Sequence, residues 1–222
     1  FVLLLYALYE GLVHAFEADH ILAVTNIVSQ RNKIFPALKD GVFWGLGHTS
    51  TIFLVGIIMI LFKVNIPDGS FSWFEAAVGL MLILVASYRL YIFLKEERKS
   101  IVHTHPHEHA GENQHPHLHV HYSGKNLHKA SYGIGLVHGL AGSGALVVLV
   151  MTQIKTITSS LLYLVLFGFG SIVGMTLVAG IFSIPFSKKL MGMKWLRVTL
   201  VIISSALCFV YGCYVIYNNL FA

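Results

Sequence analysis

The chain has 222 residues, of which 56% are apolar and only 11% carry a formal charge, and its mean hydropathy is +0.73. This composition lies far from that of soluble globular domains and argues against a soluble enzyme. The formal net charge of +5 does not indicate nucleic acid as a partner, because the basic residues gather in alternate loops between apolar segments.

Six apolar segments follow one another along the chain, and each is long enough to cross a bilayer as a helix. They lie at about 1–30, 36–62, 72–94, 130–153, 157–185 and 196–218. The sequence therefore predicts an all-α integral membrane protein with six transmembrane helices. We expect a multi-pass protein of the plasma membrane, in contact with the lipid bilayer.

The first segment is unusually rich in ionisable residues, with Glu10, His14, Glu17, Asp19 and His20. Such residues at bilayer depth are costly unless paired or hydrated, which makes them functional candidates. On a straight helix His14, Glu17 and His20 would act together, and Asp19 would point away to orient an imidazole on a neighbouring helix. A local break in the helix would instead turn Asp19 inward.

Two further histidines, His48 and His138, lie near the centres of the second and fourth segments, at about the depth of His14. A lone buried histidine is often a satisfied core hydrogen bond. Imidazoles at one depth on three helices instead indicate a site for Ni²⁺, Co²⁺, Zn²⁺ or Cu²⁺, because Mg²⁺ and Ca²⁺ prefer oxygen. The predicted metal-binding residues are His14, Glu17, Asp19, His20, His48 and His138, with Glu10 beside them in the ion path.

Glycines surround two serines of the second half, Ser143 and Ser171, and Ser171 aligns with His48 of the first half. Closely packed or broken helices can expose backbone carbonyls to an ion path. Small residues also serve plain helix contact, which is their more frequent use. We expect these serines to line the pore or to support the ligands.

The one long polar segment, about 99–129, separates two apolar halves at 1–98 and 130–222. It contains the pattern H-x-H-x-H-x-H twice, and a flexible chain of this kind can wrap several imidazoles around one ion. We expect a metal-collecting loop on the cytoplasmic side, the alternatives being a solvated linker or the remnant of an affinity tag. Its histidines are His103, His105, His107, His109, His115, His117, His119 and His121.

The two halves resemble each other in three places. The sequence Gly-Leu-Val-His at 11–14 recurs at 135–138, Gly45 and Gly47 recur as Gly168 and Gly170, and a pair of tyrosines at 88 and 91 recurs at 211 and 214. The offset is 124 for the first match and 123 for the others. Because three spans separate the copies, they would form a 3+3 inverted repeat, as in many secondary transporters, unless the matches arise by chance from a biased composition.

Basic residues set the expected orientation. Most of the 15 lysines and arginines lie after the first, third and fifth segments. By the positive-inside rule these loops are cytoplasmic, and both termini lie outside.

Two motifs carry a resemblance to a known family. The stretch 14–20, His-Ala-Phe-Glu-Ala-Asp-His, fits the signature H-x4-D-H, and 46–51, Leu-Gly-His-Thr-Ser-Thr, is similar to L-G-H-S-T. With these motifs the chain resembles the nickel/cobalt transporter family and its six-span urease-accessory and efflux relatives in the lysine-exporter-like superfamily. The resemblance implies transport of Ni²⁺ or Co²⁺ by His14, Asp19, His20 and His48. Glu17 stands where uptake permeases usually have Asp, and H-x2-E-x2-H is similar to the efflux relatives.

These patterns favour a secondary transporter of a divalent transition-metal ion, nickel or cobalt with zinc also suited, that needs no resident cofactor. Uptake is slightly favoured, and the alternative is an efflux permease loaded by the histidine-rich loop. An intramembrane metal-dependent hydrolase is a remote alternative, because the H-E-x-x-H motif of zinc proteases is missing. Candidate partners are a cytoplasmic metallochaperone and urease-maturation proteins.

Overall fold

The computed structural model describes residues 2–31, 33–62, 68–99, 127–154, 156–187 and 194–222, and side chains within these ranges except at 68–70, 96–99, 141–153 and 194. Over these residues the chain forms helices and no strand. The helices are α1 (Val2–His14), α2 (Ala18–Val28), α3 (Ile34–Phe62), α4 (Asp68–Lys99), α5 (Leu127–Gln153), α6 (Ile157–Ser183), a 3-10 turn η1 (Ile184–Phe186) and α7 (Lys194–Leu220).

Four helical stretches are long and apolar enough to cross a membrane: Ile34–Phe62, Phe71–Lys95, Ile157–Phe186 and Trp195–Leu220. Many of their large apolar side chains are exposed, among them Leu54, Leu84, Phe169 and Val210. Such a surface is unfavourable in water and suits contact with lipid. The all-helical membrane architecture that the composition predicts is confirmed.

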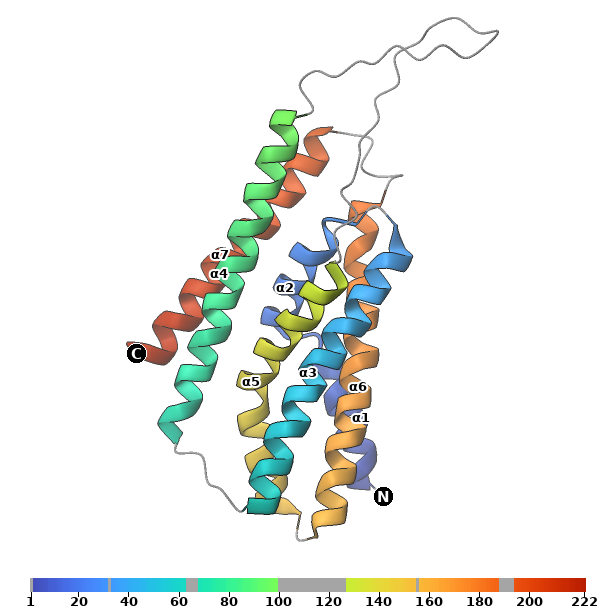
Figure 1. Ribbon diagram of the computed structural model, residues 1–222, viewed down its shortest axis with the longest axis vertical. Helices are drawn as coiled ribbons and strands as arrows, with labels where there is room; N and C mark the ends of the chain where they lie inside the picture. The colour runs from blue at the N-terminus through green and yellow to red at the C-terminus, as the bar shows by residue number, and fades with distance from the viewer. Residues whose placement is uncertain (1, 32, 63–67, 100–126, 155, 188–193) are drawn as a thin grey trace, which may run out of the picture.

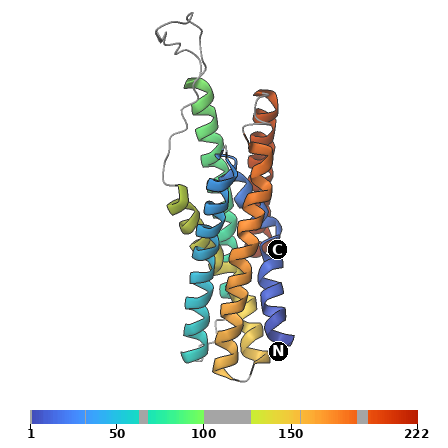
Figure 2. The same ribbon diagram turned by 90° about the vertical axis from the view of Figure 1, so that its right-hand side faces the viewer.

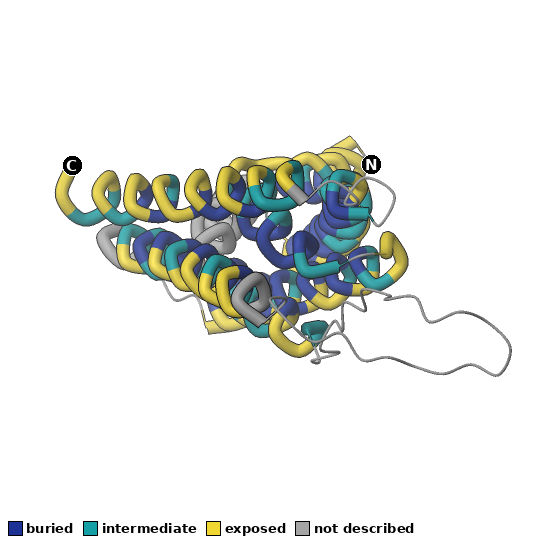
Figure 3. The backbone as a smooth tube through the Cα atoms, turned by 90° about the horizontal axis from the view of Figure 1, so that it is seen from above, coloured by how far each residue is buried: buried dark blue, intermediate teal, exposed yellow. Residues whose placement is uncertain are grey.

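The helices form a bundle and a flanking pair (Figure 1). In the bundle, α3 packs against both α5 and α6, and α1 packs against α6. The pair consists of α4 and α7, which contact each other along their length and lean away from the bundle (Figures 1 and 2). Helix α2 contacts both α4 and α7, and α5 contacts α4, so these two helices connect the pair to the bundle. Viewed from above, the buried residues of the bundle helices face one another (Figure 3).

The first predicted span is not one continuous helix. Helix α1 ends at His14, and Glu17 is extended, with φ −64° and ψ 154°, before α2 begins at Ala18. The break contains neither proline nor glycine, the usual causes of a kink. Instead, the Asp19 carboxylate accepts the backbone N–H of His20 at 2.8 Å, a local bond that competes with helical pairing. The straight first helix is therefore wrong, and the alternative with a local break is the observed one.

Glycines let α1 and α6 touch backbone to backbone. A Cβ added at Gly11 would collide with the carbonyl oxygen of Phe167 and lie 3.0 Å from the backbone nitrogen of Ser171. A Cβ added at Gly170 would collide with the carbonyl oxygen of Leu8. Only a residue without a side chain permits this approach, which is a common device in membrane bundles.

Helices α3 and α5 meet in the same way. A Cβ added at Gly135 would collide with the carbonyl oxygen of Trp44 and lie 3.0 Å from the backbone nitrogen of His48. A Cβ added at Gly47 would collide with the carbonyl oxygen of Tyr132. Each residue of this interface stands 123 or 124 positions from its counterpart in the contact between α1 and α6.

Candidate metal centre

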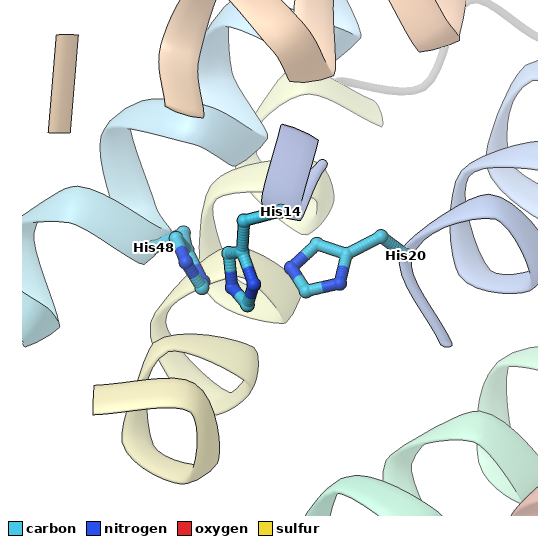
Figure 4. A group of neighbouring side chains, drawn as sticks. All are labelled: His14, His20 and His48. Carbon is cyan, nitrogen blue, oxygen red and sulfur yellow. The ribbon is translucent and has the colours of Figure 1, made fainter. Parts of the chain in front are cut away.

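Four buried histidines from four helices meet in the middle of the bundle: His14 of α1, His20 of α2, His48 of α3 and His138 of α5. The ring centroids of His20 and His138 are 4.0 Å apart, and those of His14 and His20 are 4.5 Å apart. His48 lies 5.2 Å from His14 and 5.3 Å from His20. In Figure 4, His14, His20 and His48 point toward one another from three separate segments.

Among the residues that the structure describes, five ring nitrogens of this cluster are buried and have no hydrogen-bond partner. They are Nε2 of His14, Nε2 of His20, Nδ1 of His138 and both nitrogens of His48. Buried polar atoms are nearly always paired, because an unpaired one costs free energy. Ligand atoms of His14, His20 and His48 all lie within 4.8 Å of one another, close enough to bind one ion together.

Carboxylates hold the opposite nitrogens of three of these rings. Asp19 contacts His20 Nδ1 at 2.9 Å through Oδ1 and His138 Nε2 at 2.8 Å through Oδ2. Glu17 contacts His14 Nδ1 at 2.8 Å. A carboxylate behind an imidazole fixes the orientation of the ring and raises the basicity of its free nitrogen, the usual arrangement around protein-bound metals. The break after His14 positions both carboxylates for these contacts.

The two carboxylates differ in their surroundings. The side chain of Asp19 is 22% exposed, whereas that of Glu17 is 57% exposed. Asp19 also accepts the backbone N–H of His20, so its oxygens make three hydrogen bonds. Glu17 is therefore the more accessible of the two carboxylates, and it holds one ring where Asp19 holds two.

The structure brings together all six residues that the sequence predicts as metal-binding: His14, Glu17, Asp19, His20, His48 and His138. Glu10 lies one turn before His14, near Tyr6 and outside this cluster. Ser171 is buried, and its hydroxyl makes no hydrogen bond to any described residue. The side chain of Ser143 and the eight histidines at 103–121 lie outside the described residues.

Two residues near the cluster are absent from the predicted set. Glu75 of α4 interacts electrostatically with Asp19 and His138. It is the one carboxylate within the third apolar segment. Because it lies close to the start of that segment, the sequence places it near the membrane surface and not among the mid-membrane candidates. Trp44 stacks on His20 with ring centroids 5.7 Å apart. It stands four residues before His48, a spacing that puts both side chains on one face of a helix and could have predicted its place beside the cluster.

Comparison with known proteins adds the decisive observation. The model of the NicO family, described as high-affinity nickel-transport protein, matches residues 1–214. The chain belongs to the NicO family. The predicted family is thereby confirmed, and because NicO is a family of transporters, the hypothesis of an intramembrane hydrolase is set aside. No solved structure matches this NicO protein.

Three relatives are similar to this NicO protein. The urease accessory protein UreH of Bacillus sp. (strain TB-90) is 33% identical over 210 residues, which cover 94% of this chain and 87% of UreH. The nickel transporter NixA of Staphylococcus aureus (strain NCTC 8325 / PS 47) is 39% identical over 86 residues, 37% of this chain and 24% of NixA. The hydrogenase nickel incorporation protein HupN of Bradyrhizobium diazoefficiens is 30% identical over 90 residues, again 37% of this chain and 24% of HupN.

Proposed function

We propose that this NicO protein is a secondary transporter that carries Ni²⁺ across the plasma membrane through the histidine cluster. The observation that carries the proposal is the set of five buried ring nitrogens that have no partner among the described residues, gathered where four helices meet. Neutral imidazole nitrogens are good ligands for Ni²⁺ and Co²⁺, and they suit Zn²⁺ as well. Similarity to the nickel transporter NixA favours nickel as the cargo.

The ligands in this proposal are one nitrogen each of His14, His20, His48 and His138. Asp19 orients His20 and His138 and does not bind the ion directly, because its oxygens already accept hydrogen bonds from both rings and from a backbone N–H. Glu17 orients His14. The two carboxylates offset the two positive charges of the ion, which an apolar surrounding would otherwise exclude.

The transport unit has six spans arranged as a 3+3 inverted repeat. In this arrangement α1 and α2 together make the first, broken span, and α3, α4, α5, α6 and α7 make the other five. Support comes from the paired glycine contacts, in which α1 meets α6 through the same positions as α5 meets α3. The repeats are 1–98 and 130–222, the loop is 99–129, and rocking of one repeat against the other would expose the site to each side in turn.

The histidine-rich loop lies on the cytoplasmic side and both termini lie outside. Lys39, Lys95 and Lys129 support this orientation, since they stand where α3 begins, α4 ends and α5 begins, all at one end of the molecule (Figure 1). The eight loop histidines would collect or deliver the ion there.

The named roles of UreH and HupN favour uptake, because supplying an enzyme inside the cell with nickel requires entry of the ion. The same roles make urease-maturation proteins or a metallochaperone fitting partners. Export of the ion is the alternative direction.

Metal flux into proteoliposomes tests the proposal. Residues 103–121 are deleted throughout, so that binding to the loop does not pass for transport, and Ni²⁺, Co²⁺, Zn²⁺ and Mn²⁺ are compared. We expect saturable Ni²⁺ flux that vanishes in His14→Ala and His48→Ala but persists in Ser50→Ala, which changes an exposed residue on the same helix as His48. Unchanged Ni²⁺ flux in the histidine variants would exclude the proposed site.

A further inference from the structure

The histidine cluster is covered at both ends by a large buried aromatic side chain. Trp44 of α3 is 1% exposed and lies one turn from His48, toward the Ile34 end of the helix. Its ring centroid is 5.7 Å from that of His20 and 5.6 Å from that of His138. It belongs to an apolar cluster that includes Val24 and Val28. Trp44 therefore seals the cluster from the end at which α3 begins.

Phe167 of α6 occupies the corresponding place at the other end. It is 1% exposed, lies one turn from Ser171 toward the Ile157 end of α6, and approaches His14 with ring centroids 5.6 Å apart. It packs in a second apolar cluster with Ile52, Met59 and others. Helices α3 and α6 run in opposite directions, so the two rings cover opposite ends of the histidine cluster (Figures 1 and 2).

The two aromatic residues are also equivalent in the repeat. Trp44 and Phe167 stand 123 positions apart. The backbone carbonyl of Trp44 abuts Gly135, and that of Phe167 abuts Gly11, which are themselves equivalent glycines. Trp44 therefore packs against α5, the first helix of the second half, and Phe167 packs in the equivalent way against α1, the first helix of the first half.

We propose that Trp44 and Phe167 are the two plugs of the ion path, one on each side, and that each leaves the path when the site opens to its side. This inference builds on the proposed transport function. A partly hydrated divalent ion cannot cross a packed apolar layer without a large loss of hydration energy, so each ring blocks passage while it stays in place. Both rings are buried in this structure, so in this proposal it has both plugs closed.

The contacts of Trp44 fit a movable plug. Its indole N–H is buried and makes no hydrogen bond within the part of the chain that the structure describes, so displacing the ring breaks no hydrogen bond seen there. A Cβ added at Gly135 would lie only 2.7 Å from Cδ1 of Trp44, so this glycine leaves the ring its space. The side chain of Phe167 has no polar atom and so makes no hydrogen bond that its displacement could break. Both rings can therefore move without breaking a hydrogen bond to a described residue, at the cost of apolar contacts and of their ring contacts with the histidines.

Thiol labelling tests the plugs without any measurement of transport. The two cysteines, Cys208 and Cys213, are replaced by alanine, and Ser171→Cys places a nearly isosteric reporter in the buried region between the plugs. A charged, membrane-impermeant methanethiosulfonate is applied to one side of sealed vesicles at a time. With both plugs intact, we expect slow labelling from either side.

Removing one plug should open one side only. We expect Trp44→Ala to raise the labelling rate by about tenfold or more from the side where α3 begins, as the population of a minor open state is raised. Phe167→Ala should do so from the opposite side. Trp44→Phe retains an aromatic ring and should label as slowly as the parent, and Trp44→Leu replaces Trp44→Ala if the latter does not fold.

Unchanged labelling in both plug variants, or faster labelling from the same side in both, would overturn the proposal. The readout needs no metal. If the protein does not carry Ni²⁺ but the two variants are labelled faster from opposite sides, the proposal of two plugs stands and only the proposed transported ion is wrong.

Discussion

Asp19 is the residue on which the geometry of the centre most depends. One carboxylate fixes two of the four rings, across helices α2 and α5, whereas Glu17 fixes only His14 and is largely exposed. An amide at position 19 has a single acceptor oxygen and a donor NH₂ group, so it cannot accept from both rings at once. The effect of losing a carboxylate should therefore differ sharply between these two positions.

We expect Asp19→Asn to weaken Ni²⁺ binding by about 10- to 100-fold, the usual cost of removing a carboxylate behind a metal-binding imidazole. Glu17→Gln should weaken binding by less than about tenfold, because Glu17 is the more exposed carboxylate and holds only one ring. Isothermal titration of the purified protein without residues 103–121 gives both affinities. Equal losses in the two variants would contradict the assigned difference between the carboxylates.

At the scale of the helices, the glycine contacts set how closely α3 and α5 approach. Gly135 is pressed against the backbone of Trp44 and His48, whereas a Cβ added at Gly133, on the same helix, would meet nothing within 4 Å. The obstacle at Gly135 is backbone and not a flexible side chain, so α5 must shift to accept a methyl group. The two glycines form a matched pair for testing this interface.

Gly135→Ala should destabilise the protein by about 1–3 kcal/mol or more, as overpacking does in a close-packed core. Gly133→Ala should be neutral or slightly stabilising, because alanine is the better helix former. Thermal unfolding in detergent compares the two variants with the parent. Equal stability of the two variants would mean that α5 can move away from α3 without cost.

The sequence predicts the helices well and the break in the first one poorly. Long apolar runs predict the helices, and ionisable residues inside them point to His14, His48 and His138, which the structure brings together. The break at 15–17 has no Pro or Gly to mark it, because it depends on Asp19 bonding to the next backbone N–H and to a ring 119 residues away. Glu75 and Trp44 were missed for a similar reason, since their importance comes from tertiary neighbours.

At the scale of the whole molecule, a buried ion-pair network closes the end at which the histidine-rich segment joins the bundle. Asp40, at 1% exposure, is held by Arg31 at 2.5 and 2.8 Å and by His128 Nδ1 at 2.6 Å. His128 follows the segment and belongs to α5, and Arg31 follows α2. The start of α5 is therefore fixed to α3 by contacts that the loop does not supply.

Deleting 103–121 should accordingly leave the ion path intact while changing the apparent affinity or the regulation of transport. The measurement is the concentration dependence of Ni²⁺ flux with and without the segment. Asp40→Asn, which weakens the network but keeps the segment, serves as the contrasting variant and should reduce stability. Complete loss of flux on deletion of the segment would give the loop an obligatory part in the path.

The bond between Asp19 and His138 has a consequence for how the protein is made. Its two partners are 119 residues apart, and at about 5–20 residues per second roughly 6–24 s of translation separate them. During that interval Asp19 and His20 are already in the nascent first half, while the ring that Asp19 orients has not been synthesised. Because α1 packs on α6 and α3 on α5, the first half alone lacks the helices against which two of its own helices pack. The four-histidine arrangement, with Asp19 holding His138, can therefore form only after the start of the second half has been translated.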